Sequence, residues 1–257
     1  MTDAVDQELS FIEHLVELRS RLLKACAAIF VILLFMLPFA RKLYAVLAEP
    51  LTAVLPEGSS MIAIDVASPF LTPFKLALLL SLILAIPFVL YQLWAFVAPA
   101  LYRHEKRLAK PLLFTSVFLF YAGCAFAYFV VFPLVFGFFT RVAPEGVTVM
   151  TDISKYLDFV ITLFLAFGLA FEVPIATIIL VATGVTTVDK LKKMRAYVVV
   201  GAFALGMLLT PPDVISQTLL ALPMWALFEI GLVLSRFLLP HRDRGEAEEE
   251  PADQATS

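Results

Sequence analysis

The sequence predicts an all-α membrane protein with six transmembrane helices. Hydrophobic residues make up 61% of the 257 residues, against roughly 45–50% in soluble proteins, and the mean hydropathy is +0.93. Charged residues account for only 16% of the chain, and they gather between long apolar runs. Apolar runs of this kind are typical of helices that cross a bilayer.

The first segment, residues 1–24, predicts an amphipathic helix at the membrane surface. Ser10 and Glu13 have the spacing of a capping box, which predicts that the helix begins at Ser10. Beyond it, apolar residues recur on one face, whereas Glu17 and Arg21 fall on a polar stripe. We expect this helix to lie on the membrane surface and to lead into the first span.

A transmembrane domain is expected over residues 25–235. Its spans are uncharged apart from Glu172 in the fourth and Glu229 near the end of the sixth. We expect Pro87 to kink the second span. The six spans are predicted at 25–40, 76–101, 111–139, 159–184, 196–209 and 214–235.

The connections between the spans differ in length and composition. Residues 41–70 predict a loop with one short helix, which the backbone restriction before Pro50 should end. Residues 189–195 predict a basic loop, and the charged tail 236–257 is expected to be disordered. Only four residues join the last two spans, which predicts a tight helical hairpin with Asp213 as the N-cap of the final helix.

The last two spans are expected to be short, and the fifth, residues 196–209, is the shorter of the two. At 1.5 Å per residue it covers only ~21 Å, against a hydrocarbon core of ~30 Å. We therefore expect a thinned bilayer beside it, or a hairpin that ends below the opposite surface. The sequence has no convincing internal repeat, which disfavours a transporter built from two repeated halves.

The basic residues predict the orientation of the chain. Of the 19 lysines and arginines, 14 flank one side of the predicted spans and five the other. The positive-inside bias then predicts that both termini are cytoplasmic. The 14 are Arg19, Arg21, Lys24, Arg103, Lys106, Arg107, Lys110, Lys190, Lys192, Lys193, Arg195, Arg236, Arg242 and Arg244.

Known catalytic and metal-binding patterns are missing from the sequence. No glycine-rich phosphate loop is followed by Lys-Ser/Thr, and His104 has no second histidine at metalloprotease spacing. Cys26 and Cys124 both lie in apolar runs, where cysteine commonly acts as a small core residue. We expect no enzyme activity, no cofactor and no metal.

Glu172 is the costliest residue for a membrane protein to accommodate. A carboxylate at the bilayer centre costs about 2.5–3.5 kcal/mol on insertion scales. One interpretation is a neutral acid that is hydrogen-bonded to a neighbouring helix. Another is a proton-coupled secondary transporter or channel built around Glu172, followed as it is by Pro174.

Glu17 and Glu105 are acids among many bases. Local interactions could explain both, since Glu17 can pair with Arg21 at i, i+4 and Glu105 precedes a helix N-terminus. Alternatively, the two carboxylates form a site for a basic ligand, because arginine pairs bidentately with carboxylate. A membrane scaffold without a ligand of its own is a third possibility.

Several motifs surround these acids. Residues 14–21 read HLVELRSR and residues 96–105 read FVAPALYRHE. Further segments read DVASPF, FEVP and MLLTPPDVISQ, at residues 65–70, 171–174 and 207–217. Together they resemble the TatC family, the core subunit of the twin-arginine protein translocase, from about residue 9 to residue 237.

The resemblance implies a glove-shaped six-helix protein of the bacterial cytoplasmic membrane. It would bind the twin-arginine signal peptides of folded cargo proteins and support their export, driven by the proton gradient. The implied partners are single-span TatB-like and TatA-like subunits, further copies of itself and the lipid bilayer, with no nucleic acid.

The resemblance also implies roles for individual residues. The signal-peptide site would comprise Glu17, Arg19, Phe96 and Glu105. The residues expected to dock the partner subunits are Met207, Thr210 and Gln217. Glu172 would lie on the concave face inside the membrane, and the positions that act from the extracytoplasmic side would be Pro50 and Asp213.

Overall fold

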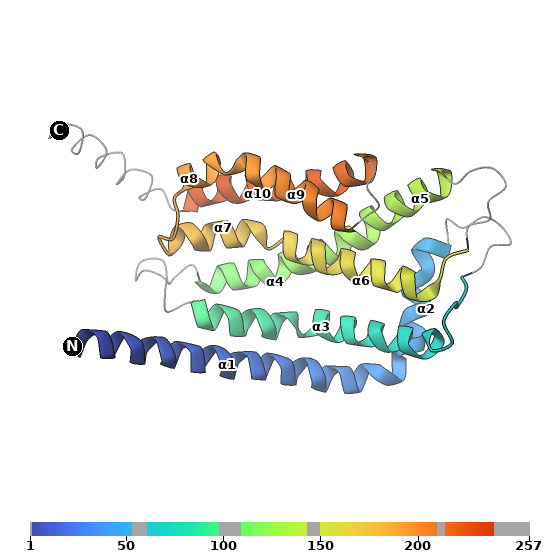
Figure 1. Ribbon diagram of the computed structural model, residues 1–257, viewed down its shortest axis with the longest axis horizontal. Helices are drawn as coiled ribbons and strands as arrows, with labels where there is room; N and C mark the ends of the chain where they lie inside the picture. Colours follow the sequence, from blue (N-terminus) through green and yellow to red (C-terminus); the bar gives the residue numbers. More distant parts are fainter. Residues whose placement is uncertain (1, 53–60, 98–108, 143–149, 210–213, 239–257) are drawn as a thin grey trace. The chain divides into compact units, whose positions relative to one another are not determined.

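The computed structural model describes residues 2–52, 61–97, 109–142, 150–209 and 214–238, which are almost entirely helical (Figure 1). These residues contain no β-strand, only an isolated bridge between Ile62 and Asp152. The α-helices are α1 (Thr2–Met36), α2 (Ala40–Thr52), α3 (Ser68–Val97), α4 (Ala109–Phe126), α5 (Phe132–Val142), α6 (Ile153–Ala170), α7 (Val173–Ala182), α8 (Val188–Lys193), α9 (Arg195–Leu209) and α10 (Val214–Leu238).

The described helices are apolar enough to provide the predicted spans. Five helical stretches could cross a membrane by length and composition: Leu15–Glu49, Ser68–Phe96, Lys110–Phe138, Ile153–Ala182 and Gln217–Leu238. The shorter apolar helix Arg195–Leu208 supplies the sixth. The all-α, six-helix prediction is confirmed. The short fifth span is confirmed as well, because the 15 residues of α9 cover only ~22 Å. The sixth span is not short, because the 25 residues of α10 cover ~37 Å.

Helix α1 starts earlier than the capping-box prediction. It runs unbroken for 35 residues from Thr2, so Ser10 lies inside the helix and the predicted start at Ser10 is wrong. The preceding residues include Ala4, Glu8 and Leu9, which are good helix formers, and they extend the helix upstream.

Two connections hold more helix than the sequence predicted. Helix α2 continues through Pro50 to Thr52, so the predicted end before Pro50 is wrong. The helix ends two residues later, and a proline in the last turn removes only one backbone donor. The predicted basic loop contains α8, because the Thr187 side chain accepts a hydrogen bond from the Lys190 N–H at 3.2 Å and caps the helix.

Prolines reshape the third and fourth spans. A five-residue π-helix, Ala127–Val131, joins α4 to α5, and Pro133 is the second residue of α5. Proline has no N–H and its ring clashes with the carbonyl four residues earlier, so one wider turn accommodates it without ending the helix. In the fourth span, α6 ends at Ala170 and α7 begins at Val173, with Pro174 in the first turn of α7.

The chain divides into two compact units. One comprises residues 1–100, 109–117 and 139–161, and the other comprises residues 101–108, 118–138 and 162–257. In the first unit α1 and α3 lie side by side, with α2 against α3 (Figure 1). In the second unit α10 packs against both α7 and α9. The core of the second unit includes Ala170, Ala202, Ala221, Met224 and Leu227.

The close approach of α7 and α10 depends on Gly231. A Cβ atom added there would lie 2.2 Å from Oγ1 of Thr177 and 2.9 Å from Cα of Pro174.

Gly231→Ala is therefore expected to lower the free energy of unfolding by about 1–3 kcal/mol, the usual cost of overpacking. Thermal unfolding of the purified protein in detergent measures it. Gly201→Ala is the matched control, because nothing lies within 4 Å of its added Cβ; equal unfolding temperatures for both variants would contradict the tight contact.

Candidate functional site

The carboxylate of Glu17 is held by Arg21 on the same helix. Glu17 Oε1 accepts hydrogen bonds from Arg21 Nε at 2.9 Å and from Arg21 Nη2 at 2.5 Å. The Arg21 side chain is 23% exposed and that of Glu17 is 37% exposed. The predicted i, i+4 pair is therefore present, and it is partly shielded from solvent.

Arg21 also links α1 to α3. Its Nη1 donates to Oε1 of the buried Gln92 at 3.4 Å. Farther along the two helices, Leu33 of α1 belongs to the same core cluster as Ala77 of α3. Because the residue numbers rise along α1 as they fall along α3, the two helices are antiparallel.

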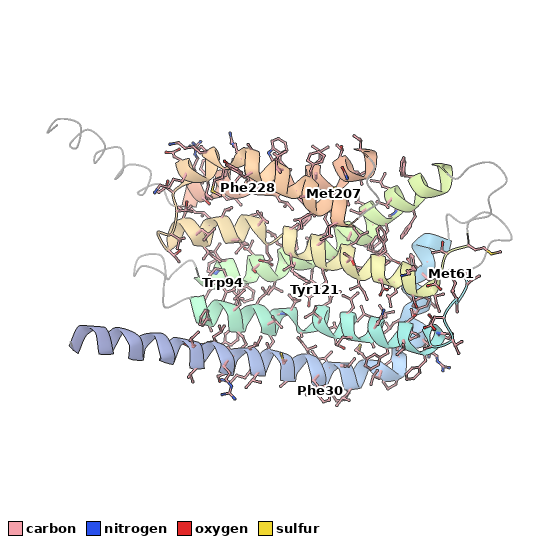
Figure 2. The ribbon with its side chains drawn as sticks, in the orientation of Figure 1. Phe30, Met61, Trp94, Tyr121, Met207 and Phe228 are labelled. Atoms are coloured by element: carbon pink, nitrogen blue, oxygen red, sulfur yellow. The ribbon has the colours of Figure 1, made fainter. Side chains whose placement is uncertain are left out.

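The antiparallel packing gathers three of the predicted site residues. Glu17 precedes Arg21 by about one turn and Arg19 precedes it by about half a turn, while Phe96 follows Gln92 by one turn. All three therefore lie at the same end of the α1–α3 pair. Phe96 is half-buried and Arg19 is exposed. Figure 2 labels Trp94, two residues before Phe96, near this end of α3.

Glu105 lies outside the described residues. It follows Phe96 by nine positions in the sequence, and the next described helix begins at Ala109. Its proximity to Glu17 therefore stays a prediction.

Glu172 lies at the interruption between α6 and α7. Its N–H donates to the Leu169 carbonyl at 3.0 Å, and its carbonyl accepts from the Ala176 N–H at 2.8 Å. The side chain is half-buried, and its Oε1 atom is shielded from solvent. The Phe171 ring packs against Phe126, with ring centroids 5.6 Å apart. Glu172 therefore places an acid at the break between α6 and α7, in a mostly apolar part of the protein.

Met207 and Gln217 lie on neighbouring helices of the second unit. Met207 is 58% exposed near the end of α9, and Gln217 is half-buried near the start of α10. The two helices approach closely at Gly206, where an added Cβ would lie 3.4 Å from the Gln217 carbonyl oxygen. Figure 2 labels Met207 on α9.

Three further predicted positions give less information. Thr210 and Asp213 lie outside the described residues, so the predicted docking role of the first and N-cap role of the second stay predictions. Pro50 lies in the last turn of α2.

An apolar cavity of about 560 Å³ opens in the second unit. One wall comes from the π-helix and its flanks, and the other comes from α10. Its lining residues are Phe126, Val130, Val131, Leu134, Val214, Thr218, Leu219, Leu222 and Pro223. With Thr218 the one polar side chain among them, the cavity suits an apolar occupant.

A polar junction that the sequence prediction missed is centred on Asp152. Asp152 Oδ1 accepts from the N–H groups of Ser154 and Lys155 at 2.9 and 3.0 Å, which caps α6. Asp152 Oδ2 accepts from the Ile64 N–H at 3.0 Å, which fastens the segment before α3 to the start of α6. An aspartate directly before an apolar helical run was the available signal, and it explains why α6 begins before residue 159.

Backbone pairing and a tyrosine strengthen this junction. The Ile62 N–H donates to the Thr151 carbonyl at 3.0 Å, and the Ile153 N–H donates to the Ile62 carbonyl at 2.9 Å. The Tyr156 hydroxyl donates to the Leu47 carbonyl of α2 at 2.8 Å. The junction therefore joins α2 and the segment before α3 to the start of α6.

The junction predicts a dependence of stability on pH. The Ile64 N–H, followed by that of Lys155, holds the pKa of Asp152 below its ordinary value of 3.8. An acid whose pKa is lower in the folded state than in the unfolded state stabilises the fold at pH values above its unfolded-state pKa. This contribution is lost as the pH falls through the folded-state pKa. We expect Asp152→Asn to flatten the acid limb of thermal stability measured between about pH 3 and pH 7. An acid limb as steep in Asp152→Asn as in the wild-type protein would contradict the account.

Arg195 explains how Glu229 is accommodated. Its Nη2 donates to Glu229 Oε2 at 2.6 Å, which joins the start of α9 to α10. The sequence analysis placed Glu229 near the end of the sixth span and predicted no partner for it. Among the described residues, no three His, Cys, Asp or Glu side chains come together as metal ligands.

Comparison with known proteins decides the family. The family profile described as Sec-independent protein translocase protein (TatC) matches residues 13–223. The TatC protein of Azotobacter chroococcum mcd 1 is 58% identical over 247 residues, which cover 96% of both chains. That of Escherichia coli strain K12 is 58% identical over 234 residues, 91% of both. The chain belongs to the TatC family.

The TatC fold is shared as well. The crystal structure of the Twin Arginine Translocase Receptor TatC matches with a TM-score of 0.78 at 38% identity. The match covers 87% of this chain and 98% of the crystallised chain. These relatives are protein translocase components, so the alternative of a proton-coupled transporter or channel around Glu172 is not supported.

Proposed function

We propose that this TatC-family chain is the receptor and core subunit of a twin-arginine translocase. Its ligands would be signal peptides with two consecutive arginines, carried by folded cargo proteins. The observation that supports this most is the gathering of Glu17, Arg19 and Phe96 at one end of the α1–α3 pair, directly before the segment that carries Glu105.

The chemistry of these residues suits an arginine pair. A carboxylate can accept two hydrogen bonds from one guanidinium, whereas lysine offers it only a point charge. The half-buried Phe96 adds an aromatic face, on which a guanidinium can stack. Glu17 and Glu105 would each take one arginine, and Arg19 would belong to the same surface.

The receptor end would face the cytoplasm. The exposed Arg19 and Lys24 follow Glu17 on α1, and the positive-inside bias favours such residues on the cytoplasmic side. The chain would then be a multi-pass protein of the bacterial cytoplasmic membrane with both termini inside.

Export would require single-span partners, and the α9–α10 hairpin is the surface we propose for them. The exposed Met207 offers apolar contact, and Gln217 offers a polar group whose hydrogen bonds are favourable in lipid. Thr210 would complete this surface. The TatB-like and TatA-like subunits would bind here, and the receptor complex would contain several copies of the chain.

The energy for export would come from the transmembrane proton gradient. We propose that Glu172 contacts the inserted signal peptide or responds to protonation at the α6–α7 break. Pro50 and Asp213 would act from the extracytoplasmic side. If a Glu172→Gln variant exports cargo as well as the wild-type protein, export does not require an ionised Glu172.

Site-specific crosslinking tests the receptor assignment. A photoreactive residue beside the arginines of a signal peptide is expected to label the chain near Glu105 and Glu17. Crosslinks confined to the α9–α10 hairpin would place the arginines elsewhere and contradict the proposal.

A further inference from the structure

Arg21 presents to Glu17 the chemical group that a signal peptide would bring. Two of its guanidinium nitrogens, Nε and Nη2, converge on Oε1 of Glu17 at 2.9 and 2.5 Å. This is a charge-assisted contact between guanidinium and carboxylate, the interaction expected of the twin-arginine motif. An arginine of the protein itself therefore holds one of the two proposed receptor acids.

A neighbouring helix orients this arginine. Gln92 is only 7% exposed, and its Oε1 lies 3.4 Å from Arg21 Nη1. A buried amide needs a hydrogen-bond partner, so this contact favours one orientation of the guanidinium over the many available to a surface side chain. Arg21 is thus fixed from two sides, by Glu17 on α1 and by Gln92 on α3.

We infer that Arg21 is an internal competitor of the signal peptide, which covers the Glu17 carboxylate until an incoming arginine displaces it. The inference rests on the proposed function of Glu17. Displacement lowers the affinity for every cationic ligand by the same factor, because each must first break the Arg21 contact. Arg21 would therefore set an affinity threshold that a twin-arginine peptide exceeds and a weaker, twin-lysine peptide does not.

Arg21→Lys tests the inference at constant net charge. A lysine offers Glu17 one nitrogen in place of two, so the internal contact weakens while the surface potential is kept. With the full-length protein in nanodiscs at fixed ionic strength, we expect twin-arginine peptide affinity to rise about two- to fivefold, the range of a partly exposed ion pair. A twin-lysine peptide should gain by the same factor, so the ratio of the two affinities is unchanged.

Two controls and a second test variant separate this effect from others. Arg195→Lys changes a second arginine–carboxylate pair, with Glu229, and should leave both affinities unchanged. In a Glu17→Gln background, Arg21→Lys should have no effect, because the group for which the two cations compete is gone. Arg21→Met, which removes the guanidinium altogether, should also raise the affinity for the twin-arginine peptide.

The outcomes also distinguish the inference from the proposed function. Unchanged or weaker peptide binding by both Arg21→Lys and Arg21→Met would overturn the inference, and a loss would indicate that Arg21 positions Glu17 for the ligand. Equal affinities of the wild-type protein for the two peptides would instead overturn the proposed selectivity. The effect of Arg21 on affinity would still be measured in that case.

Discussion

Replacing Glu105 or Glu17 by glutamine is expected to reduce twin-arginine peptide binding by about tenfold or more and to stop export. Each substitution keeps the size of the side chain but removes the negative charge, and a hydrogen bond to a charged group contributes about 1.5–3 kcal/mol. Peptide titration of the protein in nanodiscs and transport of a folded cargo into vesicles give the two measurements. The double variant Glu17→Gln/Glu105→Gln should bind the peptide no more tightly than whichever single variant has the lower affinity.

The control for this prediction is a carboxylate outside the proposed site. Asp189 is exposed on α8, where Lys192 pairs with it, and it lies outside the proposed site. Asp189→Asn should therefore leave peptide binding and export unchanged. If Glu17→Gln and Glu105→Gln behave like this control, the two acids do not form the receptor.

Gln217→Leu and Met207→Ala are expected to stop export while peptide binding is retained. Gln217→Leu removes a polar group that would pair within the bilayer, and Met207→Ala removes apolar contact area. Fewer than about 30% of the residues in an interface contribute more than 1 kcal/mol, and we expect these two to be among them. The loss in partner affinity would then be about fivefold or more. Co-purification of the single-span partners measures this loss, and vesicle transport measures its consequence.

The neighbouring Leu208 supplies the control for the hairpin surface. It is 82% exposed, more than Met207, and lies on the same turn of α9 without belonging to the proposed docking set. Leu208→Ala should keep both partner binding and export. A loss of peptide binding by Gln217→Leu would contradict the account, because it would mean that the hairpin supports the receptor end of the chain.

The sequence predicted the helical spans well because their apolar runs are long. The spans at α9 and α10 differ from their predicted limits by three residues or fewer. The ends of other helices were predicted less well, because several local signals compete there. Asp152 caps α6 through Ser154 and Lys155, seven residues before the predicted start of the span. The start of α1 depends on helix propensities that one capping motif does not override.

The candidate site was predicted in part. The Glu17–Arg21 pair followed from helical spacing, whereas its link to Gln92 required the packing of α1 on α3, which the sequence pattern does not give. The same packing gathers Glu17 and Phe96. The resemblance to the TatC family supplied Met207 and Gln217, since an exposed methionine and a half-buried glutamine carry no signal of their own.

The most direct test of the receptor account compares two peptides that differ only in the arginine pair. A twin-arginine signal peptide and its twin-lysine version are titrated against the wild-type protein, with and without the single-span partners. The account predicts at least about tenfold tighter binding of the twin-arginine peptide, because guanidinium can match a carboxylate at two points. Equal affinities for the two peptides would contradict it.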